Sequence, residues 1–199
     1  MAALGVWILW LGWFGFNGGS ELVVSNESAA IAVSQVFLNT NMAAAGGVVA
    51  AIITSLVLTG KMDVTMAMNG AIAGLVSITA SPSAPSAGIA LLIGAAGGAL
   101  VYFSILYFDK RLKLDDPVGA ISAHGIVGIL GVMVVPFTSD ASFIWQAIGV
   151  ISISGFSFFA SLGTILLINN FMPIRASDEE QDVGLDLSEI GVEAYPDFK

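Results

Sequence analysis

Long apolar stretches separated by short polar breaks run along nearly the whole chain. A membrane-spanning helix needs about 20 consecutive, mainly apolar residues, and most of these stretches reach or approach that length. The pattern predicts six membrane-spanning helices, the third of them marginal in length: residues 2–22, 29–58, 64–80, 87–108, 117–137 and 143–172. We therefore expect an all-α, polytopic transmembrane helix bundle with short loops.

Prolines and glycines punctuate the predicted helices. Pro82 and Pro85 lie between the third and fourth helices, where they suit a turn because proline cannot continue a helix. Gly46 and Gly47 are candidates for a break in the long second helix. Other small residues recur at spacings that favour close packing of helix backbones, with room for a pore as the alternative. These positions are Gly15 and Gly19, residues 94–99, and Gly125, Gly128 and Gly131.

The basic residues predict how the helices are oriented in the membrane. Lys61 follows the second helix, three cations lie between residues 110 and 113 after the fourth, and Arg175 follows the sixth. With six spans, all of these places fall on one side of the membrane, and the loops on the other side contain no Lys or Arg. Because loops rich in Lys and Arg stay in the cytoplasm, this side is predicted to be cytoplasmic, together with the C-terminal tail.

The composition agrees with a lipid environment and narrows the chemistry. Of 199 residues, 56% are apolar and 11% are charged, against about 25% charged in soluble domains; the mean hydropathy is +0.90. There is no cysteine and one histidine, which excludes disulfides and cysteine-ligated metals. The net charge of −9 belongs largely to the last 22 residues, which contain eight of the fifteen acids. Nucleic acid is therefore not an expected partner.

The only histidine, His124, is the most informative residue. It lies seven residues into the helix predicted at 117–137, about 10 Å from its start. An ionisable side chain at this depth is a candidate functional residue, although a structural histidine with satisfied hydrogen bonds is the alternative. A neutral imidazole offers one donor and one acceptor. His124 could thus bind a polar solute or relay a proton.

Two other groups of residues have both a structural and a functional interpretation. Trp13, Phe16 and Ser20 share one face of the first helix, either as a packing stripe or as an aromatic constriction with a hydroxyl outside it. Asn39, Thr40 and Asn41 lie within the second helix, where their polar groups would form interhelical hydrogen bonds or line a pore. Asp115 and Asp116, just before the predicted helix at 117–137, are expected to cap its N-terminus. No nucleophile–base pair or metal cluster indicates an enzyme.

Several of these motifs together resemble the ammonium transporters of the Amt/Rh family, Amt type. Residues 11–20 (LGWFGFNGGS) resemble the sixth helix of that family, residues 39–41 (NTN) the seventh, and residues 115–128 (DDPVGAISAHGIVG) the tenth. The tail resembles the family's cytoplasmic tail, with GLDLSE at 184–189 and EAY at 193–195. Ile190 stands where many members have histidine, which bears on tail interactions more than on the pore.

The resemblance implies a homotrimer of eleven-helix subunits in the plasma (inner) membrane. This chain would supply the second inverted repeat and the final helix in residues 1–172, followed by an acidic cytoplasmic tail in residues 173–199. Such a chain would be a fragment, a truncated gene product or one half of a split transporter, and would need the missing N-terminal half to complete a pore. No cofactor is implied.

The resemblance also assigns roles to individual residues. Phe16 would belong to the external gate, Ser20 would recruit ammonium with Trp13 supporting it, and His124 would be one of two pore histidines. The substrate would be ammonium/ammonia, crossing a hydrophobic pore. The alternative function is that of an ammonium sensor acting through its tail, with a PII-type nitrogen-regulatory protein as a possible partner.

Overall fold

The computed structural model describes residues 1–114 and 116–197. These residues form helices and connecting turns, without a strand. The chain divides into two compact units, Met1–Ile151 and Ser152–Lys199, and each unit is described by itself. The all-helical prediction is confirmed for the part of the chain that the structure covers.

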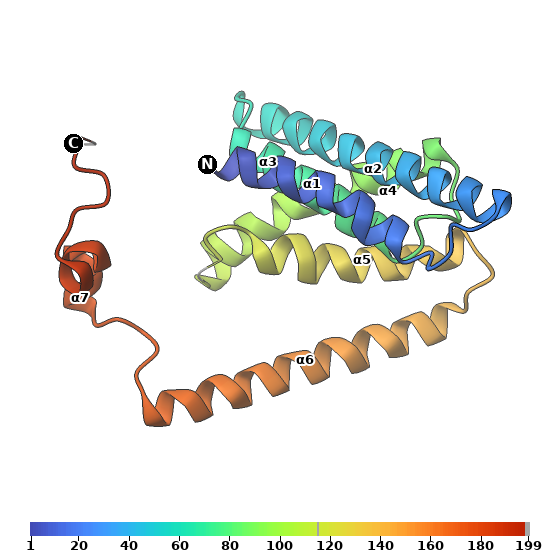
Figure 1. The fold of residues 1–199 in the computed structure, drawn as a ribbon. Helices are drawn as coiled ribbons and strands as arrows, with labels where there is room; N and C mark the ends of the chain where they lie inside the picture. Colours follow the sequence, from blue (N-terminus) through green and yellow to red (C-terminus); the bar gives the residue numbers. More distant parts are fainter. Residues whose placement is uncertain (115, 198–199) are drawn as a thin grey trace. The chain divides into compact units, whose positions relative to one another are not determined.

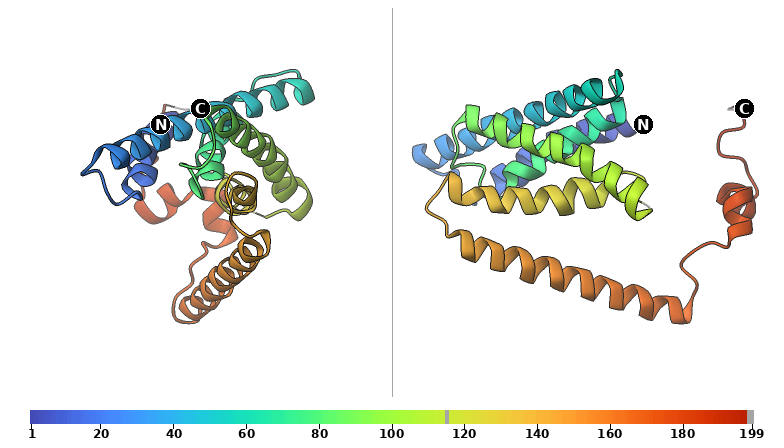
Figure 2. Two further views of the ribbon diagram at one scale, coloured as in Figure 1. Left: turned by 90° about the vertical axis from the view of Figure 1, so that its right-hand side faces the viewer. Right: turned by 180° about the vertical axis from the view of Figure 1, so that it is seen from behind.

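The first unit is a bundle of helices that run up and down beside one another (Figure 1). The views in Figure 2 show that the turn between α2 and α3 lies at the same end of the bundle as the segment after α4. This end therefore collects two of the three basic places. The helices are α1 (Ala2–Gly19), α2 (Glu27–Thr59), α3 (Val64–Thr79), α4 (Ala87–Tyr107) and α5 (Val127–Val134), followed by α6 (Phe143–Phe171), which continues into the second unit.

Three helical stretches among the described residues are long and apolar enough to cross a membrane. They are Glu27–Thr59, Ala87–Leu112 and Phe143–Phe171. Val64–Thr79 and Ile121–Phe137 are shorter apolar helices, and α1 has 18 residues, about 27 Å at 1.5 Å per residue. The number of six spans stays a prediction.

Side-chain caps explain why α2, α3 and α4 begin where they do. Asn26 accepts a hydrogen bond from the backbone N–H of Ala29, Asp63 caps α3, and Ser86 caps α4. Each cap satisfies an N–H that has no partner within the helix. α2 ends at Gly60, whose φ of 72° lies in the left-handed region that favours glycine.

The core of the first unit lies where α2, α3 and α4 touch through glycine. A Cβ atom on Gly47 would overlap the carbonyl oxygen of Gly70, one on Gly94 that of Ala43, and one on Gly98 that of Gly47 itself. The close-packing interpretation is therefore confirmed for Gly94 and Gly98, which belong to the run at residues 94–99. The predicted break at Gly46 and Gly47 is wrong, because α2 is continuous there and both glycines serve to admit neighbouring backbones.

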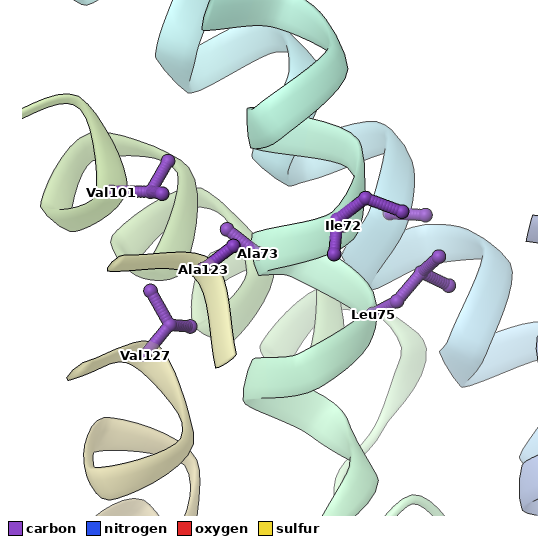
Figure 3. Close-up of a cluster of buried hydrophobic side chains, with 7 residues drawn as sticks. Ile72, Ala73, Leu75, Val101, Ala123 and Val127 are labelled. Atoms are coloured by element: carbon purple, nitrogen blue, oxygen red, sulfur yellow. The ribbon is translucent and has the colours of Figure 1, made fainter. Parts of the chain in front are cut away.

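Apolar side chains close the core beside these glycine contacts. Figure 3 shows side chains of α3, α4 and the helix that contains Ala123 and Val127 meeting in one cluster. Its labelled members are Ile72, Ala73, Leu75, Val101, Ala123 and Val127. By contrast, Gly15 and Gly19 of α1 have no neighbour within 4 Å for an added Cβ. Close packing at this pair is therefore not seen in the chain as described.

The second unit contains most of α6 and a short structured tail. α7 (Asp178–Val183) begins with a capping box in which Ser177 and Glu180 bond each other's backbone N–H groups. The hydrogen bond from the Ser177 N–H lowers the pKa of the Glu180 carboxyl. A π-helical turn follows at Asp186–Ile190, and the N–H of Ala194 lowers the pKa of Asp186 in the same way. The division into residues 1–172 and 173–199 stays a prediction.

Candidate functional site

His124 lies in the first turn of its helix, close to the N-terminal end of that helix. The helix does not begin at residue 117 as predicted; a π-helical segment, Ile121–Ile126, opens it. The delay has a local cause, because Gly119 adopts a φ of 70°, outside the helical region. The predicted depth of seven residues is therefore wrong, and the imidazole is exposed in this chain.

Asp116 holds this helix start in place, as predicted for a capping residue. Its carboxylate accepts hydrogen bonds from the N–H groups of Ile121 and Ser122, each at 3.2 Å. Asp115 lies outside the described residues. π-helical turns inside α-helical segments occur frequently at functional sites, and this one contains His124.

Two cavities meet at His124. The larger, called here the Phe16 cavity, has a volume of about 760 Å³ and is lined by Trp13, Phe16, Thr79 and His124 with apolar side chains between them. The smaller, the Asn69 cavity, has a volume of about 380 Å³ and is lined by Thr65, Asn69 and His124, again with apolar neighbours. His124 is thus the polar side chain shared by both walls.

Trp13 connects α1 to the histidine and to α3. Its ring centroid lies 6.3 Å from that of His124 and 5.6 Å from that of Phe16. Its indole N–H donates a 2.8 Å hydrogen bond to the Thr79 hydroxyl, which donates in turn to the Leu75 carbonyl at 2.7 Å. The hydrogen bond to Thr79 therefore orients the indole, whose ring lies beside His124.

Ser20 does not join this group in the structure. α1 ends at Gly19, and Ser20 follows as its C-cap with an exposed side chain. Its hydroxyl donates a 2.8 Å hydrogen bond back to the Phe16 carbonyl, and it is not among the described residues that line the Phe16 cavity. The Phe16 ring itself is 63% exposed. Trp13, Phe16 and His124 come together, whereas Ser20 lies apart at the end of α1.

The amides of α2 form hydrogen bonds within the bundle. Asn39 donates to the carbonyls of Pro82 and Pro85 at 2.8 and 2.7 Å, and Thr40 accepts from Asn17 of α1 at 3.0 Å. This confirms the interhelical interpretation for Thr40, whereas Asn39 bonds the loop between α3 and α4, and Asn41 is exposed. Sequence reasoning missed Asn17 and Thr79. The signal for both was a polar side chain in an apolar helix, but their partners lie on other helices.

No group of three metal-ligating side chains occurs among the residues that the structure describes. The site is therefore a largely apolar wall with a few polar atoms. The chain matches the Ammonium Transporter Family over residues 1–195. It belongs to this family. Members among its relatives are named as transporters, which agrees with the prediction that the chain is not an enzyme.

Named relatives and solved structures support this assignment. The chain is 35% identical to Ammonium transporter Amt2 of Archaeoglobus fulgidus, with 99% of this chain and 46% of that protein covered. It is 33% identical to the Ammonium transporter of Bacillus subtilis, with 98% and 51% covered. The chain thus spans about half the length of the relatives it matches.

The fold is also shared with solved structures. A structure titled Sensor Amt Protein superposes with a TM-score of 0.86 at 35% identity, covering 94% of this chain and 48% of that one. Mep2 of Candida albicans superposes with a TM-score of 0.80 at 25% identity, covering 89% and 43%. The all-α bundle is therefore that of an integral membrane protein of the ammonium transporter family.

Proposed function

We propose that this chain forms part of a transmembrane path for ammonium/ammonia, with His124 in the wall of a hydrophobic pore. The observation that carries the proposal is the position of His124 between two largely apolar cavities, beside an indole held by Thr79. The names of the relatives support ammonium as the solute.

The physical argument concerns the charge of the solute. Moving a small cation into an apolar cavity is costly because its hydration is lost. Neutral ammonia needs only hydrogen-bond partners, and His124 can offer a donor and an acceptor. We therefore infer that the solute loses a proton before it passes the histidine, and that the imidazole contributes to the path of the solute or of the proton.

We assign Phe16 to the external gate and Ser20 to recruitment of the cation at its mouth, with Trp13 as support. Phe16 lines the Phe16 cavity next to Trp13, with their ring centroids 5.6 Å apart, which suits an aromatic gate. Recruitment by Ser20 requires its hydroxyl to keep a free lone pair, which it does while donating to the Phe16 carbonyl.

We further propose that the complete path needs a second set of helices. His124 and Phe16 are exposed in this chain, and the chain spans about half the length of its relatives. An N-terminal half that supplies the opposite wall and a second histidine would enclose both cavities. Assembly as a homotrimer in the plasma membrane, with the tail in the cytoplasm, belongs to the same proposal.

Uptake of labelled methylammonium tests the transport function. Cells without their own ammonium transporters would express this chain alone, or together with the N-terminal half of a relative. We expect uptake only with both halves, and a reduction of at least about tenfold with His124→Leu, from the loss of one hydrogen-bonding group in the pore. Leu9→Ala, which alters the same two walls without touching the imidazole, is the control. Unchanged uptake with His124→Leu would remove this residue from the mechanism.

A second candidate function is sensing, favoured by the superposition on a structure titled Sensor Amt Protein. The capped α7 and the following π-helical turn give the tail a defined shape that a cytoplasmic protein of the PII type could recognise. Deletion of residues 178–199 separates the two functions. A sensor loses its response to ammonium while uptake persists, whereas a transporter without a signalling role shows no such response before or after deletion.

A further inference from the structure

The segment after α4 concentrates positive charge in one turn. Three of the six Lys and Arg residues of the chain, Lys110, Arg111 and Lys113, fall within four positions. All three are exposed. Asp109 belongs to the same turn, so Phe108–Lys113 contain three basic residues and one acidic residue. No ion pair compensates these cations among the residues that the structure describes.

The backbone of this segment holds the cations close together. Phe108–Leu112 form a π-helical turn, and Lys113 adopts a φ of 52° in the left-handed region. The carbonyl of Phe108 accepts hydrogen bonds from the N–H groups of both Lys113 and Leu114, the latter at 3.0 Å. The chain therefore turns at the end of α4, and the three basic residues belong to a single compact turn.

The length of the helix sets the depth of this turn in a bilayer. The continuous helical stretch Ala87–Leu112 has 26 residues, about 39 Å along its axis, whereas the hydrocarbon layer is about 30 Å thick. Its last residues therefore reach the headgroup layer. Tyr107 and Phe108, whose ring centroids lie 6.2 Å apart in an edge-to-face arrangement, come shortly before the cations, and tyrosine favours that layer.

We propose that the turn Phe108–Lys113, the basic turn, binds the phosphate of an anionic phospholipid. Arg111 can offer paired N–H donors to phosphate oxygens, and the two lysines add point charges on either side of it. The aromatic pair would lie against the upper part of the acyl chains. The charged residues in the loops at the opposite end of the bundle, among them Glu21 and Asp140, are all acidic, so binding is restricted to one leaflet. This inference does not depend on the transport function.

Lipid titration of the purified chain tests the proposal. The chain in detergent is titrated with dioleoyl phosphatidylglycerol, with dioleoyl phosphatidylcholine, and with inorganic phosphate, and bound molecules are counted by native mass spectrometry. Each basic residue near an anionic surface contributes about 1 kcal/mol. We therefore expect K110Q/R111Q/K113Q to weaken binding of phosphatidylglycerol about 100-fold, while K110R/K113R retains it.

The chain offers a control with the same change in net charge. K61Q/R175Q/K199Q removes the other three cations of the sequence, and should leave phosphatidylglycerol binding within about threefold, less than one residue's contribution. Equal weakening by both triple variants would overturn the site, because net charge alone would then explain binding. Equal affinity for phosphatidylcholine, or for inorganic phosphate, would overturn the assignment to an anionic lipid.

Discussion

The two sides of the first unit are built from different residues. On one side, α2, α3 and α4 meet backbone to backbone at glycines, with Gly47, Gly94 and Gly98 in the contacts. On the other side, α1 and the helix of His124 line two cavities, and the rings of Trp13, Phe16 and His124 line the larger one. The difference teaches that the tightly packed helices α2, α3 and α4 support the wall that contains the candidate site. This wall has few polar atoms, and its own side chains are loosely packed.

The largest effect is expected where backbones touch. Gly94→Ala places a Cβ atom onto the carbonyl of Ala43, and overpacking that only a helix shift can relieve should cost about 3 kcal/mol. Gly88 lies in the same helix with no atom within 4 Å of an added Cβ. Gly88→Ala should be neutral or stabilising, because alanine favours helix over glycine.

Thermal unfolding in detergent, followed by the helical circular dichroism signal, measures both variants. The pair of glycines should give shifts of opposite sign in the unfolding temperature. Similar shifts for the two variants would contradict the view that the packed side depends on backbone contact.

A smaller effect is expected where Asn39 of α2 bonds the loop between α3 and α4. Asn39→Leu leaves the carbonyls of Pro82 and Pro85 without their donor and Gln35 without its acceptor. Burying unpaired polar groups should cost about 2–3 kcal/mol. Asn41→Leu, two residues further on the exposed face of α2, should cost little. The same unfolding assay compares them, and equal losses would mean that the hydrogen bonds of Asn39 do not stabilise the loop.

The sequence predicted the helices better than it predicted the site. Apolar runs located α2, α3 and α4 to within about two residues, because the length of an apolar stretch is read directly along the chain. The structure adds the caps at Asn26, Asp63 and Ser86, which the sequence analysis did not name. The start of the His124 helix was misplaced, because Asp116 and the positive φ of Gly119 delay it.

The site could be predicted only in part, for a different reason. Trp13, Phe16 and His124 were found from residue type and motif, and they do lie together. Thr79 was missed because its partner, Trp13, is 66 positions away in the chain, and no spacing within one helix reveals a contact between helices. The shared glycine contacts of α2 and α4 were ambiguous for the same reason, since a glycine can mark either a break or a close approach.

A substitution at Thr79 should destabilise the wall that contains the candidate site without altering the glycine contacts of the packed side. Thr79→Val keeps the shape of the side chain but removes the acceptor for the Trp13 indole N–H, and should cost about 1–2 kcal/mol. Thr79→Ser keeps the hydroxyl and should restore most of this loss. Because the indole also lies beside His124, Thr79→Val should change the Trp13 fluorescence, measured with the other three tryptophans replaced by phenylalanine. Unchanged emission would show that Thr79 does not orient the ring.

The smallest effect is expected at Asp63, which caps α3, the helix that the two sides share. Its carboxylate accepts hydrogen bonds from the hydroxyl of Thr65 and from the N–H groups of Thr65 and Met66. The Thr65 hydroxyl, with the two N–H groups, lowers the pKa of Asp63 below its usual value of 3.8. A carboxyl with a lowered pKa in the folded state stabilises the fold above its unfolded pKa, and this contribution disappears as the pH falls through the folded value.

The stability of the chain should therefore decrease by up to about 1 kcal/mol, the usual contribution of an N-cap, as the pH falls below about 4. Asp63→Asn keeps an acceptor for the helix N–H groups but does not titrate, so the part of this decrease that belongs to the cap should vanish in the variant. Unfolding temperatures of the two proteins between pH 6 and pH 3 measure the difference. Because α3 packs on α2 through Gly70 and lines both cavities through Thr65 and Thr79, loosening its start should affect both sides of the bundle equally. A pH-dependent loss confined to the Trp13 fluorescence, with the unfolding temperature unchanged, would show instead that the two sides respond separately.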